Sequence, residues 1–534
     1  MTLDPTQKHV PSVRTADWGV LALLIILAAL WRVAVFNGPL GSDDGTYYAR
    51  ALDVSEGVWS SANYNGALRY GFNIPAGLML SLFGRGEFQL NLWPLLCSLA
   101  EIGVVWWFCR KRFGATVAIL AATLLLLTPL HVATATRLHA DAVANFFLTL
   151  AFILFFESEN KRSNVLAFLA GLSMGAVFWV KELLGLALLT FLLWSLITHK
   201  LERRWLWVVA GGLVMLFGHF LLMQFIAGDP LHAFRTVFGQ ISSSFIGQNE
   251  GQDGALYYVY FILLNISHTS LIGPLALAGI VLGFRNQKAA LNVSPFVQTA
   301  FWLLALLAVL SLFPVSLSPF RLAMKQSNYL GLFLAPLAIL AALALAQASP
   351  QLRNVLMVAM ALISIPLGML EQQTYRTFVA NSRGAVEFAK AHPKDVFVGT
   401  ANVYNLADID SRNRNDPAFM NRFMHLTKSS GDAMPVAPPG GRLIAFEDKE
   451  TLYHNGRNHP MAPIPTCWTK LGVVTPAGLG FSSRFAALAG QAFADLPVVG
   501  TRLQAKLESI SRPKPSIIWQ LPNDDPWCRR IVSR

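Results

Sequence analysis

The sequence predicts a polytopic α-helical membrane protein that carries a C-terminal α/β domain outside the membrane. Three observations lead to this fold class. Of the 534 residues, 54% are hydrophobic and only 13% are charged, a composition that excludes an ordinary soluble enzyme of this length. Apolar runs recur at the length that crosses a bilayer core of about 30 Å. The charged residues are divided unevenly, because 38 of the 72 lie in residues 1–370 and 34 in the last 164.

Eleven apolar runs predict about eleven membrane spans. They lie near residues 18–36, 91–109, 116–130, 141–157, 165–180, 183–198, 205–226, 258–282, 297–313, 329–347 and 355–370. The first run is long and carries Trp18 and Trp31 at its ends, so we expect an uncleaved span rather than a signal peptide. The sequence therefore predicts a membrane domain over residues 1–370 and a soluble domain over residues 371–534.

Lys and Arg residues predict the orientation of these spans, because short cytoplasmic loops collect them. With the N-terminus inside, every inner segment is basic, as at Arg110–Arg112 and Lys200–Arg204, while the longer outer segments hold scattered bases. An odd number of spans then places residues 371–534 outside. Topology accounts for the net charge of +12, so we expect no nucleic-acid partner.

The last 164 residues have the composition of a folded soluble domain. An amphipathic stretch at Arg383–His392 precedes an apolar run at residues 395–399, which predicts a helix followed by a strand and favours an α/β domain. In an oxidising exterior Cys467 and Cys528 could pair. The alternative is that this domain holds two free thiols.

Two adjacent carboxylates, Asp43 and Asp44, follow the first predicted span and open a long outer loop over residues 37–90. A carboxylate close to the bilayer surface is partly desolvated, which raises its basicity and suits it to take a proton from an acceptor. The same residues also fit a helix start, in which Ser42 or Asp43 caps a short helix that runs to Val54. The residues alone leave both interpretations open.

A second acidic site lies in the short outer turn before the fourth predicted span, where Arg137, His139 and Asp141 follow one another closely. Ionisable residues at the edge of a bilayer are costly and are commonly functional. Asp141 also fits a simple helix N-cap. We favour the functional interpretation because three such groups are gathered there.

Four basic residues adjoin span ends on the predicted outer face, where topology does not require them: Arg69, Lys181, Arg321 and Lys325. Cations at the membrane surface would neutralise the phosphate of a lipid-linked sugar and stabilise it as a leaving group. Each of them alone also fits a salt bridge or a headgroup contact, for example Lys181 with the adjacent Glu182. The joint pattern favours an anionic substrate.

With these residues assembled, the chain resembles the GT-C polytopic glycosyltransferases. It is similar to the glycosyltransferase family 39-like group of dolichyl-phosphate-mannose protein mannosyltransferases and lipid A aminoarabinose transferases. The resemblance rests first on residues 42–51, Ser-Asp-Asp-Gly-Thr-Tyr-Tyr-Ala-Arg-Ala, which look like the family's acidic outer-loop motif. Residues 137–141 match the second acidic site, and Val180-Lys-Glu182 matches a Lys-centred turn. Arg69-Tyr-Gly falls where many members carry Lys-Pro-Pro and is similar to a variant of bacterial members.

The resemblance implies a GT-C fold and an inverting sugar transfer from a polyprenyl-phosphate donor to an extracytoplasmic lipid, polysaccharide or protein. It implies that Asp43 is the base and that Asp44 and Asp141 orient the acceptor or a metal. Phosphate contacts would come from Arg69, Lys181, Arg321 and Lys325, and acceptor contacts from Arg137, His139 and Tyr47. A divalent metal on Asp43, Asp44 and His139 is left open, since some GT-C enzymes use one and others do not.

The resemblance also implies an integral protein of the bacterial inner membrane, with the C-terminal domain in the periplasm. The main alternative function is a transporter or flippase of a lipid-linked sugar, which many spans and outer cations would also suit. Transporter sites commonly lie near the bilayer midplane between related halves. The sequence shows no internal repeat and few charges deep within spans, of which Glu101 is the exception.

Overall fold

A computed structural model of the chain describes residues 14–41, 43–59, 61–199, 201–245, 254–286, 294–318, 320–323, 325–425, 437–447, 466–497 and 499–522. These residues form two compact units. Unit 1 comprises Met1–Ala34, Gly57–Ala76 and Leu92–Gly368, and unit 2 comprises Val35–Glu56, Gly77–Asn91 and Met369–Arg534.

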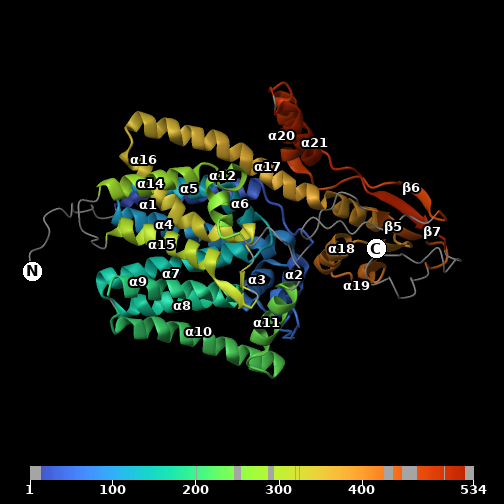
Figure 1. Ribbon diagram of the computed structural model, residues 1–534. Coiled ribbons are helices and arrows are strands. Elements are labelled where there is room, and N and C mark those ends of the chain that lie inside the picture. The colour runs from blue at the N-terminus through green and yellow to red at the C-terminus, as the bar shows by residue number, and fades with distance from the viewer. Residues whose placement is uncertain are drawn as a thin grey trace, which may run out of the picture. The chain divides into compact units, whose positions relative to one another are not determined.

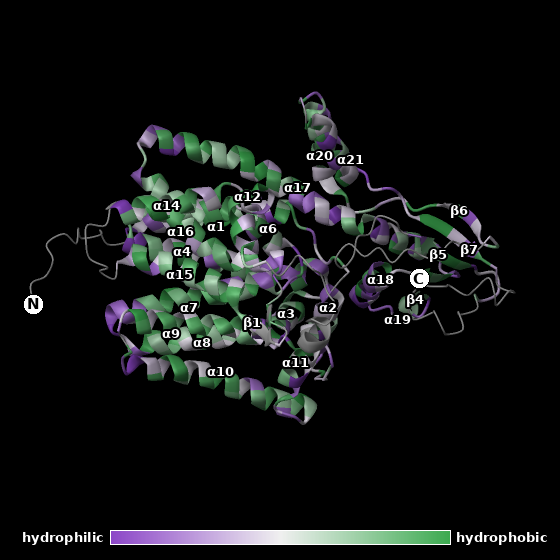
Figure 2. Cartoon of the chain, in the orientation of Figure 1, coloured by the Kyte–Doolittle hydropathy of each residue, from purple (hydrophilic) through white to green (hydrophobic). Residues whose placement is uncertain are grey.

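Unit 1 is built almost entirely from helices, most of them strongly apolar (Figures 1 and 2). Its helices are α1 (Thr15–Ala34), η1 (Asn65–Leu68), the start of α3 (Tyr70–Phe83), most of α4 (Glu87–Arg112), α5 (Ala115–Leu127), α6 (Pro129–Thr136), α7 (Asp141–Lys161), α8 (Asn164–Val180), η2 (Glu182–Ala187), α9 (Leu188–Ile197), α10 (Arg204–Ala227), α11 (His232–Phe245), α12 (Tyr257–Leu264), α13 (Ile266–Thr269), α14 (Ile272–Asn286), α15 (Pro295–Leu312), η3 (Ser327–Phe333), α16 (Leu334–Gln347) and the start of α17 (Pro350–Ala391). A short hairpin pairs β1 (Pro314–Leu317) with β2 (Phe320–Leu322).

Seven described helices are long and apolar enough to cross a membrane, and the bent pair α5 and α6 makes up to eight. Multiple spans are thus confirmed, whereas the count of eleven stays a prediction. Four shorter apolar helices also occur: Tyr70–Phe83, Asn164–Val180, Leu184–Ile197 and Ile272–Arg285. The expectation of one continuous helix over 258–282 is wrong, because the chain breaks at Asn265 and again at Ser270, whose φ of 53° is left-handed.

A proline bends the third predicted span. The axes of α5 and α6 differ by 60°, and Thr128 between them has extended backbone while Pro129 opens α6. The ring of a proline disfavours helical geometry in the preceding residue, yet its fixed φ suits the first helical position. The bend directs the short helix α6 toward the loop that carries residues 137–141.

Close helix packing positions the segment around Lys181. A Cβ on Gly171 in α8 would lie 2.0 Å from the carbonyl oxygen of Val208 in α10. A Cβ on Gly211 would likewise lie 2.2 Å from the carbonyl oxygen of Phe168. Small residues allow membrane helices to approach this closely, so α8 and α10 pack backbone to backbone beneath the turn that follows α8.

Unit 2 contains a five-stranded mixed sheet in the order β4-β3-β5-β7-β6. Its elements are α2 (Asp43–Ser55), the end of α3, the start of α4, the end of α17, β3 (Val396–Gly399), α18 (Ala401–Arg414), α19 (Pro417–Met420), β4 (Phe423–His425), β5 (Leu443–Glu447), β6 (Thr469–Val473), α20 (Gly480–Phe493), α21 (Gly500–Ser511) and β7 (Ile517–Leu521). Strand β3 is parallel to β4 and β5, and β7 is antiparallel to β5 and β6. The mixed sheet with its helices confirms the α/β prediction, including the helix before residue 392 and the strand after residue 395.

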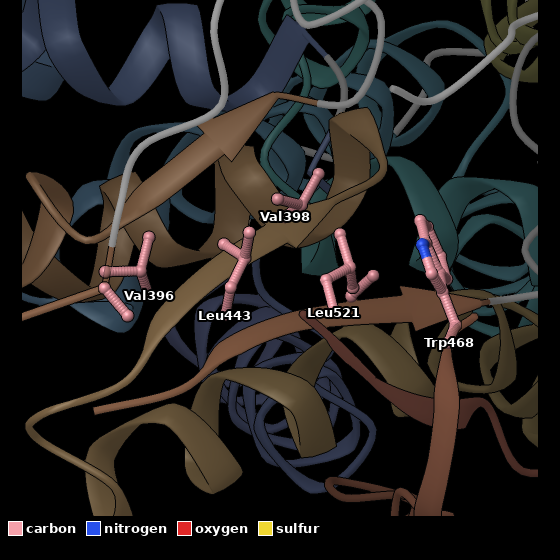
Figure 3. Close-up of a cluster of buried hydrophobic side chains, with 7 residues drawn as sticks. Val396, Val398, Leu443, Trp468 and Leu521 are labelled. Carbon is pink, nitrogen blue, oxygen red and sulfur yellow. The ribbon is translucent and has the colours of Figure 1, made fainter. Parts of the chain in front are cut away.

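Alternating side chains bury both faces of this sheet. Val396 and Val398 of β3 pack with Leu443 and Leu521 on one face (Figure 3). Phe397, between them, points to the other face, where its ring lies 5.7 Å from that of Phe446. Trp468 joins the first cluster.

Cysteine pairing is resolved in part. Cys467 is disulfide-bonded, and Cys528, its predicted partner, lies outside the described residues. Cys97 and Cys109 are free and buried.

Candidate functional site

The acidic residue before the fourth predicted span lies at the centre of a charged cluster in unit 1. Asp141 is the first residue of α7 and is 2% exposed. Its carboxylate pairs with the Nζ of Lys181 and contacts the Nδ1 of His139. The Nδ2 of Asn328 donates to its Oδ2 over 3.4 Å. The N-cap interpretation is wrong, since Ala140 is the N-cap and no side chain caps the helix.

Lys181 enters this cluster from the turn that ends α8. The residue has extended backbone and is only 4% exposed. A buried ammonium requires a partner to offset its desolvation, and Asp141 provides one. The ammonium also lies 4.8 Å from the ring centroid of Tyr329, a geometry that adds a cation–π attraction.

Positive charge dominates this cluster. Burial lowers the pKa of His139 well below its ordinary value, and the neighbouring cations Lys181, Arg137 and Arg69 lower it further. His139 is therefore neutral at physiological pH, and among the residues that the structure describes the cluster gathers three cations and two carboxyl groups. Burial also raises the pKa of one of these, Glu182, although Arg69 opposes that shift. We call Arg69, Arg137, His139, Asp141, Lys181 and Glu182 the mouth cluster.

An apolar cavity adjoins the mouth cluster. Its volume is about 560 Å³, and α8, η2, α10 and α11 supply most of its lining. Glu182 is the one charged residue of the lining, and it directly follows Lys181 in the chain. The other lining residues are apolar or glycine, for example Phe178, Leu213 and Phe234. Unit 1 thus places an excess of positive charge next to a space that suits hydrocarbon.

The structure gives less information on the other two bases of the predicted outer face. Lys325 is completely buried, whereas Arg321 lies in β2 and its side chain is outside the described part of the molecule. The structure therefore brings Arg69 and Lys181 together with the second acidic site.

The first acidic motif lies in unit 2, where it forms the start of α2. Asp43 is half-buried, and Asp44 is 3% exposed with its Oδ2 accepting a 2.6 Å hydrogen bond from the backbone N–H of Leu40. Tyr47 is fully buried. The short helix expected from the capping interpretation therefore forms, and Asp44 holds the chain that enters it.

Metal binding by these residues finds no support in the donor sets. Among the residues that the structure describes, no group of three or more His, Cys, Asp and Glu side chains could hold a metal ion. Asp141 is already paired with Lys181. We therefore derive no step that involves a metal on Asp43, Asp44 or His139.

Sequence reasoning missed two members of this environment, Asn328 and Tyr329. Both lie in η3, which precedes α16. Their contacts with Asp141 and Lys181 span 187 and 148 positions of the chain. The only available signal was their place at the predicted outer end of the tenth apolar run, directly after the basic segment with Arg321 and Lys325.

Comparison with known proteins confirms the recognition made from the motifs. Residues 73–222 match the family model described as dolichyl-phosphate-mannose-protein mannosyltransferase. The matched segment includes Arg137, Asp141 and Lys181, and it excludes Asp43 and Arg69. No curated protein sequence matches the chain.

Several solved structures align with this chain. The crystal structure of ArnT from Cupriavidus metallidurans bound to undecaprenyl phosphate aligns with a TM-score of 0.56 at 16% identity, over 81% of this chain and 94% of that one. The apo form of the same protein gives a TM-score of 0.48 at 19% identity, over 76% of each chain. The oligosaccharyltransferase of Archaeoglobus fulgidus with Zn and sulfate gives 0.47 at 14% identity, over 76% and 62%. The first of these alignments shows that the fold is ArnT-like, of the GT-C type.

Proposed function

We propose that this chain, a polytopic membrane protein with the GT-C fold and a segment of the mannosyltransferase family, transfers a sugar from a polyprenyl-phosphate donor to an extracytoplasmic acceptor with inversion. The acceptor is a lipid, a polysaccharide or a protein. The observation that carries the proposal is the excess of positive charge in the mouth cluster beside the apolar cavity of unit 1. A polyprenyl phosphate has one anionic group and one long hydrocarbon chain, which are the two chemistries that this arrangement accommodates.

Within the mouth cluster, Arg69 and Lys181 are the proposed phosphate contacts. Both charges act on His139, and Lys181 needs a buried anion beside it whether or not a donor is bound. In the transfer, the acceptor oxygen bonds to the anomeric carbon while the bond from that carbon to the phosphate oxygen breaks. Negative charge then develops on the leaving phosphate, and fixed cations in a water-poor site stabilise it strongly. Arg321 and Lys325 remain secondary candidates for the same role.

The other roles rest on the resemblance. Asp43 is the proposed base that takes the proton of the acceptor, and Asp44 orients it, consistent with the bond between Asp44 and Leu40. Asp141 holds Lys181 and, with Arg137, His139 and Tyr47, orients the acceptor. The crystal structure of ArnT contains undecaprenyl phosphate, which supports a lipid phosphate of this kind as the donor carrier.

We further propose that the chain crosses the bacterial inner membrane eleven times, with its N-terminus in the cytoplasm and residues 371–534 in the periplasm. The basic inner segments support this orientation. A reporter fused after residue 370 should be active only outside the cytoplasm, and cytoplasmic activity would contradict the orientation.

Mass spectrometry of envelope lipids and glycans tests the function directly. We expect cells with Asp43→Asn to lack one sugar on a glycan and to accumulate the lipid-linked donor. Asp53→Asn is the matched control, because Asp53 lies on the same helix and pairs with Arg50 near the surface. An unchanged glycan with a lipid-linked sugar accumulating on the inner leaflet would contradict transfer and favour the transporter.

A further inference from the structure

Unit 2 contains a polar cavity of about 280 Å³ that none of the proposed roles uses. Its lining includes Asn37, Glu87, Arg376, Arg383, Gly478 and Gly480. These residues come from three separate parts of the chain, and all belong to unit 2. We call this cavity the Arg376 pocket.

The two arginines of the pocket have different partners. Arg383 forms a two-pronged ion pair with Glu87, with Nη1–Oε1 and Nη2–Oε2 distances of 3.2 and 3.0 Å. Arg376 donates instead to neutral oxygens, the backbone carbonyl of Phe36 at 2.8 Å and the Oγ of Ser482 at 2.9 Å. Among the described residues no carboxylate pairs with Arg376. The pocket therefore carries one uncompensated positive charge.

A helix N-terminus adds to this positive potential. Helix α20 begins at Gly480, and no side chain caps it. Gly480 has a φ of 68°, and a Cβ there would lie 2.4 Å from the Nη1 of Arg376. Only glycine allows the start of the helix to approach the guanidinium so closely. The free N–H groups of a first helical turn favour an anion, as the guanidinium does.

The side chain of Asn37 offers a hydrogen-bond acceptor to a ligand in the pocket. The side chain of Asn37 is 8% exposed, and its Nδ2 donates to Gln372. The Oδ1 of Asn37 has no hydrogen-bond partner among the described residues. A buried acceptor without a partner costs free energy, and a hydroxyl group of a ligand would satisfy it.

We propose that the Arg376 pocket binds a small hydroxylated anion, with a phosphate or carboxylate on Arg376 and the start of α20 and a hydroxyl on the Oδ1 of Asn37. Sugar phosphates and uronic acids have this chemistry, and both occur as parts of envelope glycans and lipids. The site does not depend on the proposed transfer, since its ligand contacts lie wholly within unit 2.

Isothermal titration of the full-length protein in detergent tests the pocket, with glucose 6-phosphate and glucuronate as probes and glucose as the neutral control. We expect saturable binding of at least one anion, which also identifies the anionic group, and much weaker binding of glucose. Arg376→Gln should weaken the binding of the anion by about ten-fold or more, because a hydrogen bond to a charged group is lost. Arg484→Gln should leave anion binding unchanged, since Arg484 is an exposed arginine of α20.

Asn37→Asp provides a second test that keeps the shape of the side chain. The new carboxylate would neutralise Arg376, so we expect a similar loss of anion binding in a folded protein. The titration is repeated in Arg69→Ala, where binding to the Arg376 pocket should persist even though the proposed donor site is impaired. The proposal is overturned if wild type binds neither anion, if glucose binds as tightly as the anions, if both pocket variants bind like wild type, or if Arg69→Ala abolishes binding.

Discussion

Unit 1 contains two buried charge clusters that differ in their balance. In the interior cluster, fully buried Arg32 donates to the Oγ of Ser98 at 3.0 Å and contacts the Nδ1 of His131 at 2.7 Å. The Nε2 of His131 lies 3.2 Å from the Oε2 of Glu101, and the Oγ1 of Thr149 donates a 2.8 Å hydrogen bond to the Oε1 of the same carboxylate. One arginine and one glutamate therefore face each other across a histidine, and each has partners.

The mouth cluster has three cations and two carboxyl groups, one of which has a raised pKa. It also adjoins a cavity, whereas the interior cluster links α1, α4, α6 and α7. The comparison teaches that burial of charge alone does not mark a binding site. A balanced network holds helices together, while an excess of one sign beside an open space suits the binding of a ligand of the other sign.

Removing Lys181 should give the largest functional effect. We expect Lys181→Ala to lower the rate of transfer by about 10²–10³-fold, since a fixed donor to the leaving oxygen is lost. Lys161→Ala is the matched control, because Lys161 is an exposed lysine at the end of α7. Initial rates on purified protein measure the effect, and Lys181→Arg should recover part of it. Equal rates for the two alanine variants would remove Lys181 from the site.

Breaking the interior cluster should instead lower stability. Glu101→Gln leaves Arg32 without its carboxylate, and we expect a loss of about 3–5 kcal/mol in the free energy of unfolding. Donor affinity of the protein that remains folded should be unchanged. Thermal unfolding and donor titration separate the two effects, and the double variant Arg32→Met, Glu101→Met should lose less than the single one. A specific loss of donor affinity in Glu101→Gln would contradict the comparison.

Acid should destabilise the mouth cluster through His139. Its depressed pKa means that the unfolded chain binds the proton first, so stability falls as the pH drops below about 6.5. We expect His139→Asn to remove part of this fall, up to about 1.4 kcal/mol per pH unit. Melting temperatures between about pH 7 and 5 measure it. His199→Asn, at an exposed histidine, should keep the wild-type slope, and an unaltered slope in His139→Asn would contradict the burial of a neutral imidazole.

Filling the apolar cavity should have the smallest effect. Val209 and Val214 are similarly exposed on α10, but only Val209 is among the residues that line the cavity. We expect Val209→Trp to weaken the binding of a polyprenyl phosphate by about ten-fold or less, because the contacts of only one or two methylene groups, about 0.8 kcal/mol each, are displaced. Val214→Trp should bind the polyprenyl phosphate with the affinity of the wild type. Equal affinities for the two variants would place the hydrocarbon chain elsewhere.

The sequence predicts the helical membrane domain and the α/β domain because both depend on local patterns. Apolar runs have a period and a length that identify spans, and the strand at residues 396–399 follows its helix directly. The breaks at Asn265 and Ser270 were missed because the surrounding run is apolar throughout. A single left-handed residue leaves no trace in composition.

The charged part of the site was predictable, and its neighbours were not. Arg137, His139 and Asp141 are conspicuous at a span end, and so is Lys181. Their contacts with Asn328 and Tyr329 depend on how α7 and α8 meet η3, across well over a hundred residues of chain. Hydropathy and charge counts hold no information on such pairings.

The most direct test of the central claim is the affinity of undecaprenyl phosphate for the purified full-length protein and for Arg69→Ala. Arg235→Ala is the control, because Arg235 is an exposed arginine of the same unit that pairs with Asp229. We predict that Arg69→Ala lowers the affinity for the lipid phosphate by about ten-fold or more, while Arg235→Ala does not change this affinity. Equal affinities for all three proteins would contradict the assignment of the mouth cluster as the phosphate site.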